Sequence, residues 1–547
     1  MNKILKYSVR ASVSPGLFVR QLTIGHLLKK QLAIIAALAI TITVATGSFS
    51  HPSQAQDATA PVPASQIMDA VEQLDELTQA IMAETKVPGL AVAVVHQGKT
   101  LFAKGYGVRE IGKNDPIDPD TVFQIASLSK SVSASVVAHQ VSKGTVSWDD
   151  PVQQYLPWFQ LQDPWISRHV SIGDLFAHRS GLPDHAGDDL EDIGYDRRYI
   201  LEQLRYIPLH SFRNTYAYTN FGLTTGAEAV AAASGMDWES LSKSAVYEPL
   251  GMTSTSSRFE DYMAEENRAV GHALIEGVFK PALQRLPDPQ SPAGGVCSTI
   301  NDFSRWMIMI LSQGRFEGKV IIDEAALIPA ITPESISRHP ATSKDPAGFY
   351  GYGVGVNIRP SGQTMLSHSG AFILGSATNY MMLPSSELGI AVFTNGTPVG
   401  AAEALTAQFM DLVQYGEVQR EWLAGYQKLF APMNSPIGEL TGQEPPETPE
   451  PSAELTLLEG LYNSDYFGMA KLEVKNESLV LILGPDKQEF ILNHWDGEVF
   501  RFPVFNENMP FGSTSSLKFA LREDGTAKSF TIEFLNEFGL AVFDRQK

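Results

Sequence analysis

A serine and a lysine three positions apart carry the strongest chemical signal in this sequence. Ser127 and Lys130 lie in the stretch FQIASLSK at 123–130, at the start of a run rich in Ser, Ala and Val. Residues three apart share one face of a helix, so the amine can meet the hydroxyl. A lysine in a desolvated cleft has a lowered pKa and can take the proton of a serine nucleophile. By itself the pattern is also compatible with a capped helix that has no catalytic role.

Two later stretches supply the polar groups that a serine nucleophile needs. Tyr218, Thr219 and Asn220 directly precede an expected helix, and His368-Ser369-Gly370-Ala371 ends an expected edge strand. A tyrosine hydroxyl can pass a proton to a leaving group, and an asparagine amide can hold a substrate carbonyl. A glycine lets a substrate approach the backbone, and the next N–H can pair with that of the serine as an oxyanion hole. The predicted catalytic residues are Ser127, Lys130 and Tyr218, and the predicted substrate contacts are Asn220, His368, Ser369, Gly370 and Ala371.

In this order, the three stretches resemble the motifs of class C β-lactamases and related penicillin-binding-protein-like serine hydrolases. Supporting segments are LFAHRSGLP at 175–183, LGM at 250–252 and AGGVCST at 293–299. The resemblance covers about residues 66–431 and implies an α+β (α/β) fold, with an antiparallel sheet, a helical lobe and a site in the cleft between them. It also implies Ser127 as the acyl-forming nucleophile, Lys130 as its base partner and Tyr218 as a proton relay.

His368 departs from the pattern of true class C β-lactamases. Those enzymes have a lysine at this place, which helps to hold the carboxylate of the substrate. A mostly neutral histidine is a weaker anion anchor at pH 7, and it is expected to gain a proton as the pH falls toward 5.5. The His-x-Gly form is more similar to the peptidases, D-aminopeptidases and esterases of the superfamily. Efficient antibiotic hydrolysis is therefore less expected.

The elements that must position these residues follow from the apolar patterning of residues 66–431. An amphipathic helix is predicted over 68–85, and a hairpin with its turn at Gly98 is predicted from the β-rich runs on both sides. Further helices are expected at about 127–143, 221–234 and 300–313, and strands at 364–368, 377–383 and 390–394. Strands early and late with helices between them are typical of an α+β fold, whose sheet takes strands from both ends.

The pattern changes after residue 431. Residues 432–453 are rich in proline and glutamate and predict a semi-stiff, solvated linker. Residues 454–547 then show at least six short alternating runs with turn signals between them, which predicts a small antiparallel β-barrel. This part resembles the lipocalin-like barrel that is appended to some peptidases of the superfamily.

The first 55 residues have the pattern of a signal peptide. Residues 1–31 carry six basic and no acidic side chains, and the apolar run 32–45 falls short of the ~20 residues that span a bilayer. The tripeptide at 53–55 (SQA) resembles a signal-peptidase site. We expect an exported protein, periplasmic or extracellular. An uncleaved segment would instead anchor the protein in the membrane, or associate with it transiently.

The composition excludes several other classes of protein. The 547 residues include 61 acidic and 41 basic side chains, a net charge of −20 that disfavours nucleic-acid binding. Cys297 is the single cysteine, and no metal site or cofactor is expected. The acidic stretch at 188–192 lacks the ligand spacing of a calcium loop and is expected to be a solvated loop. His178 is expected in a structural turn.

The expected function is therefore a secreted serine hydrolase that works through an acyl-enzyme on peptides, D-amino-acid peptides or esters. The alternative enzyme is a β-lactamase or a D-Ala-D-Ala carboxypeptidase, that is, a penicillin-binding protein. A binding protein that has lost turnover is the opposing class, and the joint presence of Ser127, Lys130 and Tyr218 argues against it. The expected partner is a small peptide, ester or β-lactam-like substrate.

Overall fold

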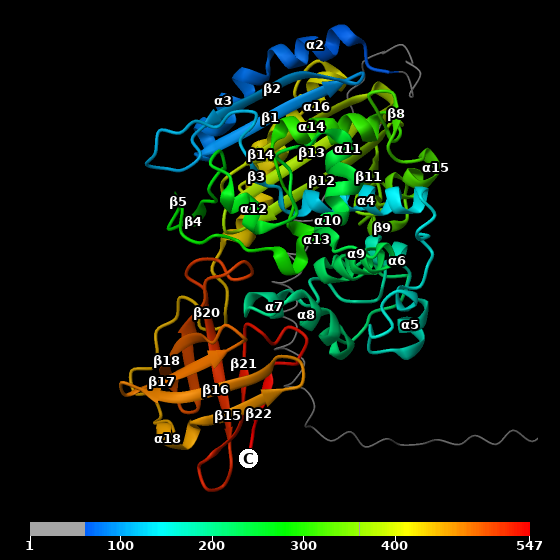
Figure 1. The fold of residues 1–547 in the computed structure, drawn as a ribbon. Coiled ribbons are helices and arrows are strands. Elements are labelled where there is room, and N and C mark those ends of the chain that lie inside the picture. The colour runs from blue at the N-terminus through cyan, green and yellow to red at the C-terminus, as the bar shows by residue number, and fades with distance from the viewer. Residues whose placement is uncertain (1–60, 360) are drawn as a thin grey trace, which may run out of the picture.

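An eight-stranded antiparallel sheet lies at the centre of the larger part of the protein (Figure 1). The computed structural model describes residues 61–359 and 361–547, so the expected signal peptide at 1–55 lies outside the described residues. The strand order is β2-β1-β14-β13-β12-β11-β10-β9. The strands are β1 (Gly89–His96), β2 (Lys99–Gly107), β9 (Ser335–Arg338), β10 (Gly348–Tyr350), β11 (Gly355–Ile358), β12 (Thr364–Phe372), β13 (Ser376–Leu383) and β14 (Leu388–Thr394). Because β1 pairs with β14, the prediction of one sheet built from both ends of this region is confirmed.

Helices cover both faces of this sheet, which is why its central strands are apolar throughout. The first face carries α2 (Ala64–Glu72), α3 (Leu74–Thr85), α16 (Ala401–Tyr415) and α17 (Trp422–Phe430). The second face carries α14 (Ile300–Leu311) and α4 (Ser129–Ser142). Along β1, Leu90, Val92 and Val94 pack on the first face, and Ala91, Ala93 and Val95 pack on the second.

The helix that we predict over residues 68–85 is two helices. α2 and α3 meet at Gln73, which lies between them as a turn residue. Neither a glycine nor a proline marks this break in the sequence. Both helices contact α16, so packing against one partner explains why the apolar pattern continues across the break.

A helical lobe lies beside the sheet and faces the C-terminal part of the chain (Figure 1). α4 and α9 (Asn220–Ser234) form its centre and confirm two of the predicted helices. The other helices around them are α5 (Pro164–His169), α6 (Ile172–Phe176), α7 (Asp188–Asp192), α8 (Arg197–Gln203), α10 (Trp238–Ser242), α11 (Glu248–Leu250), α12 (Phe259–Ala264), α13 (Ser291–Gly294) and α15 (Glu324–Leu327). Three short pairs complete this part: β3 (Phe123–Gln124) with β6 (Cys297–Ser298), β4 (Ala273–Ile275) with β5 (Val278–Lys280), and β7 (Arg315–Phe316) with β8 (Lys319–Val320).

The C-terminal strands close into an eight-stranded antiparallel barrel, as the alternating runs predict. After the short helix α18 (Leu455–Leu458), its strands are β15 (Gly460–Ser464), β16 (Gly468–Lys475), β17 (Ser478–Leu483), β18 (Gln488–Asp496), β19 (Val499–Pro503), β20 (Thr514–Leu521), β21 (Ala527–Ile532) and β22 (Val542–Arg545). The strands β15 and β22 do not correspond to any of the alternating runs; they pair with each other and close the barrel. Both are short and lack a long alternating run.

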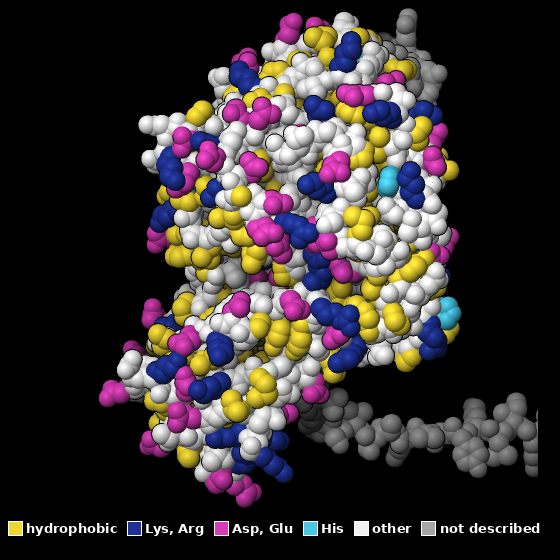
Figure 2. All heavy atoms as spheres, viewed as in Figure 1, with side chains coloured by type: hydrophobic (Ala, Val, Ile, Leu, Met, Phe, Trp, Pro, Cys, Tyr) yellow, Lys and Arg dark blue, Asp and Glu magenta, His cyan; other side chains and the backbone are white. Residues whose placement is uncertain are grey.

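The proline-rich stretch at 432–453 runs along the barrel. Ile437 N–H donates to Ser513 Oγ, and Gly497 N–H donates to Glu450 O. The barrel lies below the helical lobe, with α7 and α8 near their junction (Figure 1). Figure 2 shows acidic and basic side chains interspersed over the visible face of both parts. Within residues 61–359 and 361–547, none of the helices is both long and apolar enough to cross a bilayer.

Candidate active site

Ser127 and Lys130 lie together where the chain passes from the sheet into the helical lobe. A 3-10 turn over Ala126–Leu128 leads into α4, and Ala126 adopts a left-handed conformation with φ +47°. Lys130 Nζ lies 3.2 Å from Ser127 Oγ. Ser127 is 8% exposed, whereas Lys130 is fully buried. The predicted nucleophile therefore keeps a narrow path to solvent and the predicted base has none.

The lysine amine is held in place by two further acceptors. Nζ donates to Asn220 Oδ1 at 2.7 Å and to Ala293 O at 2.9 Å. Burial lowers the pKa of Lys130 to about 7, although the charges of Asp188 and Glu191 act in the opposite direction. At pH 8 most copies of the amine are therefore neutral, and Nζ can accept a proton from Ser127.

Asn220 connects this amine to a buried carboxylate. Its Nδ2 donates to Asp188 Oδ2 at 2.8 Å, and His185 Nδ1 also lies 2.8 Å from that oxygen. Burial lowers the pKa of His185, but the bond to Asp188 and the charges of Asp184 and Glu537 outweigh this effect and raise it. Because the amide nitrogen faces Asp188, the amide oxygen faces Lys130.

The acidic stretch Asp188–Asp192 differs from its prediction as a solvated loop. It forms α7, in which Asp188 and Glu191 are 6% and 7% exposed. Arg285 forms an ion pair with Glu191, and Tyr466 of the barrel donates to Asp189 Oδ1 at 2.9 Å. The prediction is wrong because the barrel and Arg285 bury this helix, and neither contact can be read from local sequence.

Tyr218 lies on the other side of the lysine. Lys130 Nζ lies 4.6 Å from the centre of its ring. Burial raises the pKa of Tyr218, and a contact with Ser127 opposes that rise, so the hydroxyl stays protonated at neutral pH. Tyr218 Oη forms no hydrogen bond with standard geometry, although it is buried. The hydroxyl is therefore available to exchange a proton with a group at Ser127.

His178 is a site residue whose role is not apparent from the sequence. Its O accepts the N–H of Ala217 at 2.9 Å, and its Nδ1 accepts the N–H of Thr219 at 3.2 Å. The two bonds flank Tyr218, whose ring centre lies 4.6 Å from that of His178. Burial and the charge of Lys130 hold the pKa of His178 well below its ordinary value, so the ring is neutral. The expected structural turn thus also fixes the backbone on both sides of Tyr218.

His368 is 6% exposed, and both of its ring nitrogens have partners. Nε2 lies 2.8 Å from Tyr350 Oη, and Nδ1 lies 2.7 Å from Ser369 O. Since a carbonyl only accepts, Nδ1 carries the proton and Nε2 accepts from Tyr350. Burial and the charge of Lys130 lower the pKa of His368 to about 3. The expectation that this ring gains a proton near pH 5.5 is therefore wrong.

The remaining predicted residues lie along β12. A Cβ on Gly370 would lie 2.5 Å from Ile125 O and 3.0 Å from Ser127 N, so glycine allows the 3-10 turn to lie directly against the strand. Ser369 Oγ accepts from Asn379 Nδ2 on the opposite face of the strand. The predicted contact of Ser369 with a substrate can then come only from its backbone.

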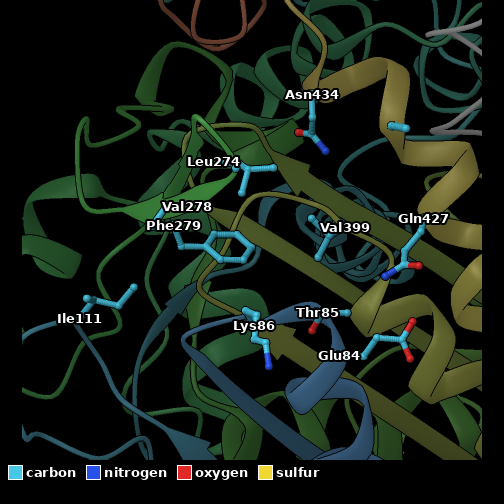
Figure 3. A pocket seen from close by; sticks show the side chains of 12 residues that line it. Glu84, Thr85, Lys86, Ile111, Leu274, Val278, Phe279, Val399, Gln427 and Asn434 are labelled. Carbon is cyan, nitrogen blue, oxygen red and sulfur yellow. The ribbon is translucent and has the colours of Figure 1, made fainter.

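A separate hollow of about 720 Å³ lies away from these residues. Side chains from the end of α3, the β4–β5 hairpin and the end of α17 surround it (Figure 3). None of the predicted catalytic or substrate-contact residues lines it. Among the described residues, no group of three or more His, Cys, Asp or Glu side chains is arranged to hold a metal ion.

The fold and this site define a penicillin-binding-protein-like serine hydrolase, and comparison with known proteins gives the family. The family model described as beta-lactamase matches residues 74–415, and the chain belongs to this family. A second model, described as a domain of unknown function (DUF3471), matches residues 444–545, which include all strands of the barrel.

Relatives with printed functions are hydrolases and penicillin-binding proteins. Unguisins hydrolase ungD' of Aspergillus campestris is 26% identical over 73% of this chain and 77% of its own length. Penicillin-binding protein 4 of Amycolatopsis lactamdurans is 27% identical over 66% of this chain and 93% of its own. A solved structure, the octameric penicillin-binding protein homologue from Pyrococcus abyssi, has a TM-score of 0.56 and 19% identity, and it covers 86% of this chain and 99% of its own. The protein is thus a serine hydrolase of this family.

Proposed function

We propose that the protein hydrolyses small peptides, D-amino-acid peptides or esters through an acyl-enzyme formed on Ser127. The observation that carries the proposal is the 3.2 Å separation of Lys130 Nζ and Ser127 Oγ, together with the pKa of about 7 that burial gives to Lys130. A neutral amine at hydrogen-bond distance from a hydroxyl is the arrangement that a general base requires.

In the proposed reaction, Ser127 Oγ attacks the substrate carbonyl while its proton passes to Lys130 Nζ. The N–H groups of Ser127 and Ala371 hold the oxyanion that forms. The bond to the leaving group then breaks, and that group takes a proton through Tyr218. Water attacks the ester on Ser127 in the second half, which releases the acid and returns the proton to the serine.

The state of His368 supports peptides and esters over substrates that depend on a carboxylate. Its ring is neutral, and its two nitrogens are bonded to Tyr350 and Ser369. It therefore offers neither a positive charge nor a free donor to an anion. The relative named as a hydrolase of unguisins is consistent with this proposal.

The alternative function is a β-lactamase or a D-Ala-D-Ala carboxypeptidase. It is supported by relatives with the corresponding names, Penicillin-binding protein 4 and the beta-lactamase of Psychrobacter immobilis, which is 27% identical over 50% of this chain and 64% of its own. The same nucleophile would serve this reaction, so the two proposals differ only in the substrate.

The test compares substrates that share the reacting carbonyl. Purified protein is given nitrophenyl esters, D- and L-aminoacyl nitroanilides, D-alanyl-D-alanine peptides and a chromogenic cephalosporin, and kcat/KM is measured for each. Esters or aminoacyl amides should be turned over at least tenfold faster than the cephalosporin and the D-alanyl-D-alanine peptides. The reverse order would favour the alternative.

Export of the protein is also part of the proposal. It rests on the basic and apolar segments of residues 1–55. Cell fractionation followed by N-terminal sequencing tests it. A mature chain in the periplasm or medium that begins near residue 56 supports export with cleavage, and a full-length chain in the membrane fraction supports an anchor instead.

A further inference from the structure

We propose that the barrel loop between β19 and β20 closes one end of the substrate groove, so that the acyl part of a substrate contains no more than two residues. The count starts with the residue that supplies the attacked carbonyl. The inference rests on the acyl-enzyme function proposed above and assigns the barrel a role in substrate selection.

The substrate groove in this proposal is the outer edge of β12. Gly375 N–H donates to Phe372 O at 3.0 Å in the turn between β12 and β13. Successive residues of a strand direct their backbone groups to opposite edges, so Ala371 directs its N–H and C=O away from β13. Ile373 lies in the turn that follows, and its C=O accepts from Thr397 Oγ1 at 2.6 Å. On that outer edge, β11 pairs with β12 only over the first four residues, Thr364 to Ser367.

Both ends of this outer edge are occupied. At one end, beyond the β11 pairing, His368 Nδ1 donates to Ser369 O. At the other end, Glu507 Oε1 accepts the N–H of Ile373 at 2.8 Å. Between these contacts lie the N–H and C=O of Ala371. The length of edge that a substrate can use is therefore short.

An extended acyl group that pairs antiparallel with this edge would exchange two hydrogen bonds with Ala371. Its attacked carbonyl accepts the Ala371 N–H, and the N–H of the same residue donates to Ala371 O. Two residues earlier in the substrate, the next carbonyl would meet the N–H of Ile373, which is already bound by Glu507. A third residue must therefore displace the Glu507 carboxylate.

The loop that presents Glu507 is held firmly. Asn506 Oδ1 accepts the N–H groups of Asn508 and Met509, and Asn506 N–H donates to Met509 O. Asn508 Nδ2 donates to Asp192 Oδ2 of α7 at 2.8 Å. The second carboxylate oxygen of Glu507 lies 3.9 Å from Arg285 Nε, and the side chain is 13% exposed. The end of the groove is thus attached to the helical lobe.

The test uses covalent probes of increasing length on the full chain. Diphenyl aminoalkylphosphonates extended by zero, one or two alanyl residues present acyl parts of one, two and three residues. Ser127 Oγ forms a P–O bond, one phenoxide leaves, and the serine proton passes to Lys130. The second-order labelling rate is measured for each probe by intact mass. The wild type should label at similar rates with the first two probes and at least about tenfold more slowly with the third.

Two variants open the groove, and a third serves as a control. Glu507→Ala removes the carboxylate. Because Val504 N–H donates to Ser513 O, the loop ends already pair as a hairpin, and residues 505–512 can be replaced by Asn-Gly. Glu523→Ala makes the same chemical change in the exposed β20–β21 turn beside α18. Circular dichroism and retained labelling by the shortest probe establish that each variant is folded.

The ratio of long-probe to short-probe labelling decides the proposal. It should rise at least about tenfold in Glu507→Ala or in the loop replacement, and it should stay at the wild-type value in Glu523→Ala. Equal labelling of the wild type by all three probes would overturn the inference. An unchanged ratio in a folded loop replacement would overturn it too. Both results would leave the serine hydrolase mechanism intact. No labelling of the wild type by any probe would contradict the proposed function and this inference together.

Discussion

The carboxylate of Asp188 determines which end of the Asn220 amide faces the lysine. Asn220 Nδ2 donates to Asp188 Oδ2 at 2.8 Å, and Asn220 Oδ1 accepts from Lys130 Nζ at 2.7 Å. A residue of α7, a helix that contacts the barrel through Asp189, thus orients a partner of the catalytic amine. Substitutions in α7 should therefore alter the chemistry at Ser127 although they do not contact Ser127.

Asp188→Asn should move the acidic limb of the kcat/KM profile to lower pH. The charge of Asp188 raises the pKa of Lys130, so its removal lowers that pKa and leaves the amine neutral at lower pH. Loss of the bond that orients Asn220 should also reduce kcat by about 10- to 100-fold. Asp189→Asn is the matched control, because it makes the same chemical change at a neighbouring side chain that bonds Tyr466 rather than Asn220. A limb that moves to higher pH in Asp188→Asn would contradict this account.

Lys130→Met should gain stability relative to the wild type at low pH and lose that gain as the pH rises. The pKa of Lys130 is about 7 in the folded state and 10.5 in the unfolded chain. A buried amine with a lowered pKa decreases the free energy of unfolding. The full decrease applies below pH 7, and it disappears as the pH rises past about 10.5. The difference in unfolding free energy between the two proteins should change by about 4 kcal/mol between pH 6 and pH 10. Urea unfolding at several pH values measures this difference. A difference that does not vary with pH would show that the pKa of Lys130 is not lowered to this extent.

His178 should act as a positioning residue for Tyr218. Its Nδ1 and O accept N–H groups on both sides of that tyrosine, and an asparagine oxygen can replace Nδ1 whereas a leucine cannot. We expect His178→Leu to lower kcat by about 10- to 100-fold with a smaller change in KM, and His178→Asn to recover most of the loss. Equal losses in two folded variants would mean that the ring acts through its volume alone.

The preference between neutral and carboxylate-bearing substrates should not change between pH 7.5 and pH 5.5. With a pKa of about 3, His368 remains neutral over this range, while protonation of Lys130 slows both substrates alike. The ratio of kcat/KM for a matched ester pair, with and without a carboxylate, should stay within about twofold. A marked rise for the carboxylate substrate at pH 5.5 would mean that His368 titrates there.

The short motifs allowed most of the site to be located from sequence. Ser127 and Lys130 share a helix turn, so their contact is a local property that spacing can predict. The burial of α7 was not predicted, because it depends on Tyr466 and Arg285, which lie 277 and 94 residues from their partners on that helix. The neutrality of His368 likewise depends on burial and on the charge of Lys130, and neither is encoded near the His-x-Gly motif.

The sheet was predicted from its apolar strands, whereas edges and closures were harder to predict. β1 and β14 are buried on both faces and have long apolar runs. The short strands β15 and β22 close the barrel through two paired residues, Tyr462 with Arg545 and Asn463 with Asp544. Pairs so far apart in sequence leave no periodic signal, and they form because the rest of the barrel brings the two strands together.

Direct capture of the acyl-enzyme tests the central claim most sharply. Wild-type protein is mixed with a nitrophenyl acetate, quenched in acid within the first turnover and digested, and the acetyl group is located by mass spectrometry. We predict one acetyl group on the peptide that contains Ser127, with a burst of nitrophenol, and neither signal in Ser127→Ala. An acetyl group on another residue, or a full burst in the folded Ser127→Ala variant, would contradict the assignment of Ser127 as the nucleophile.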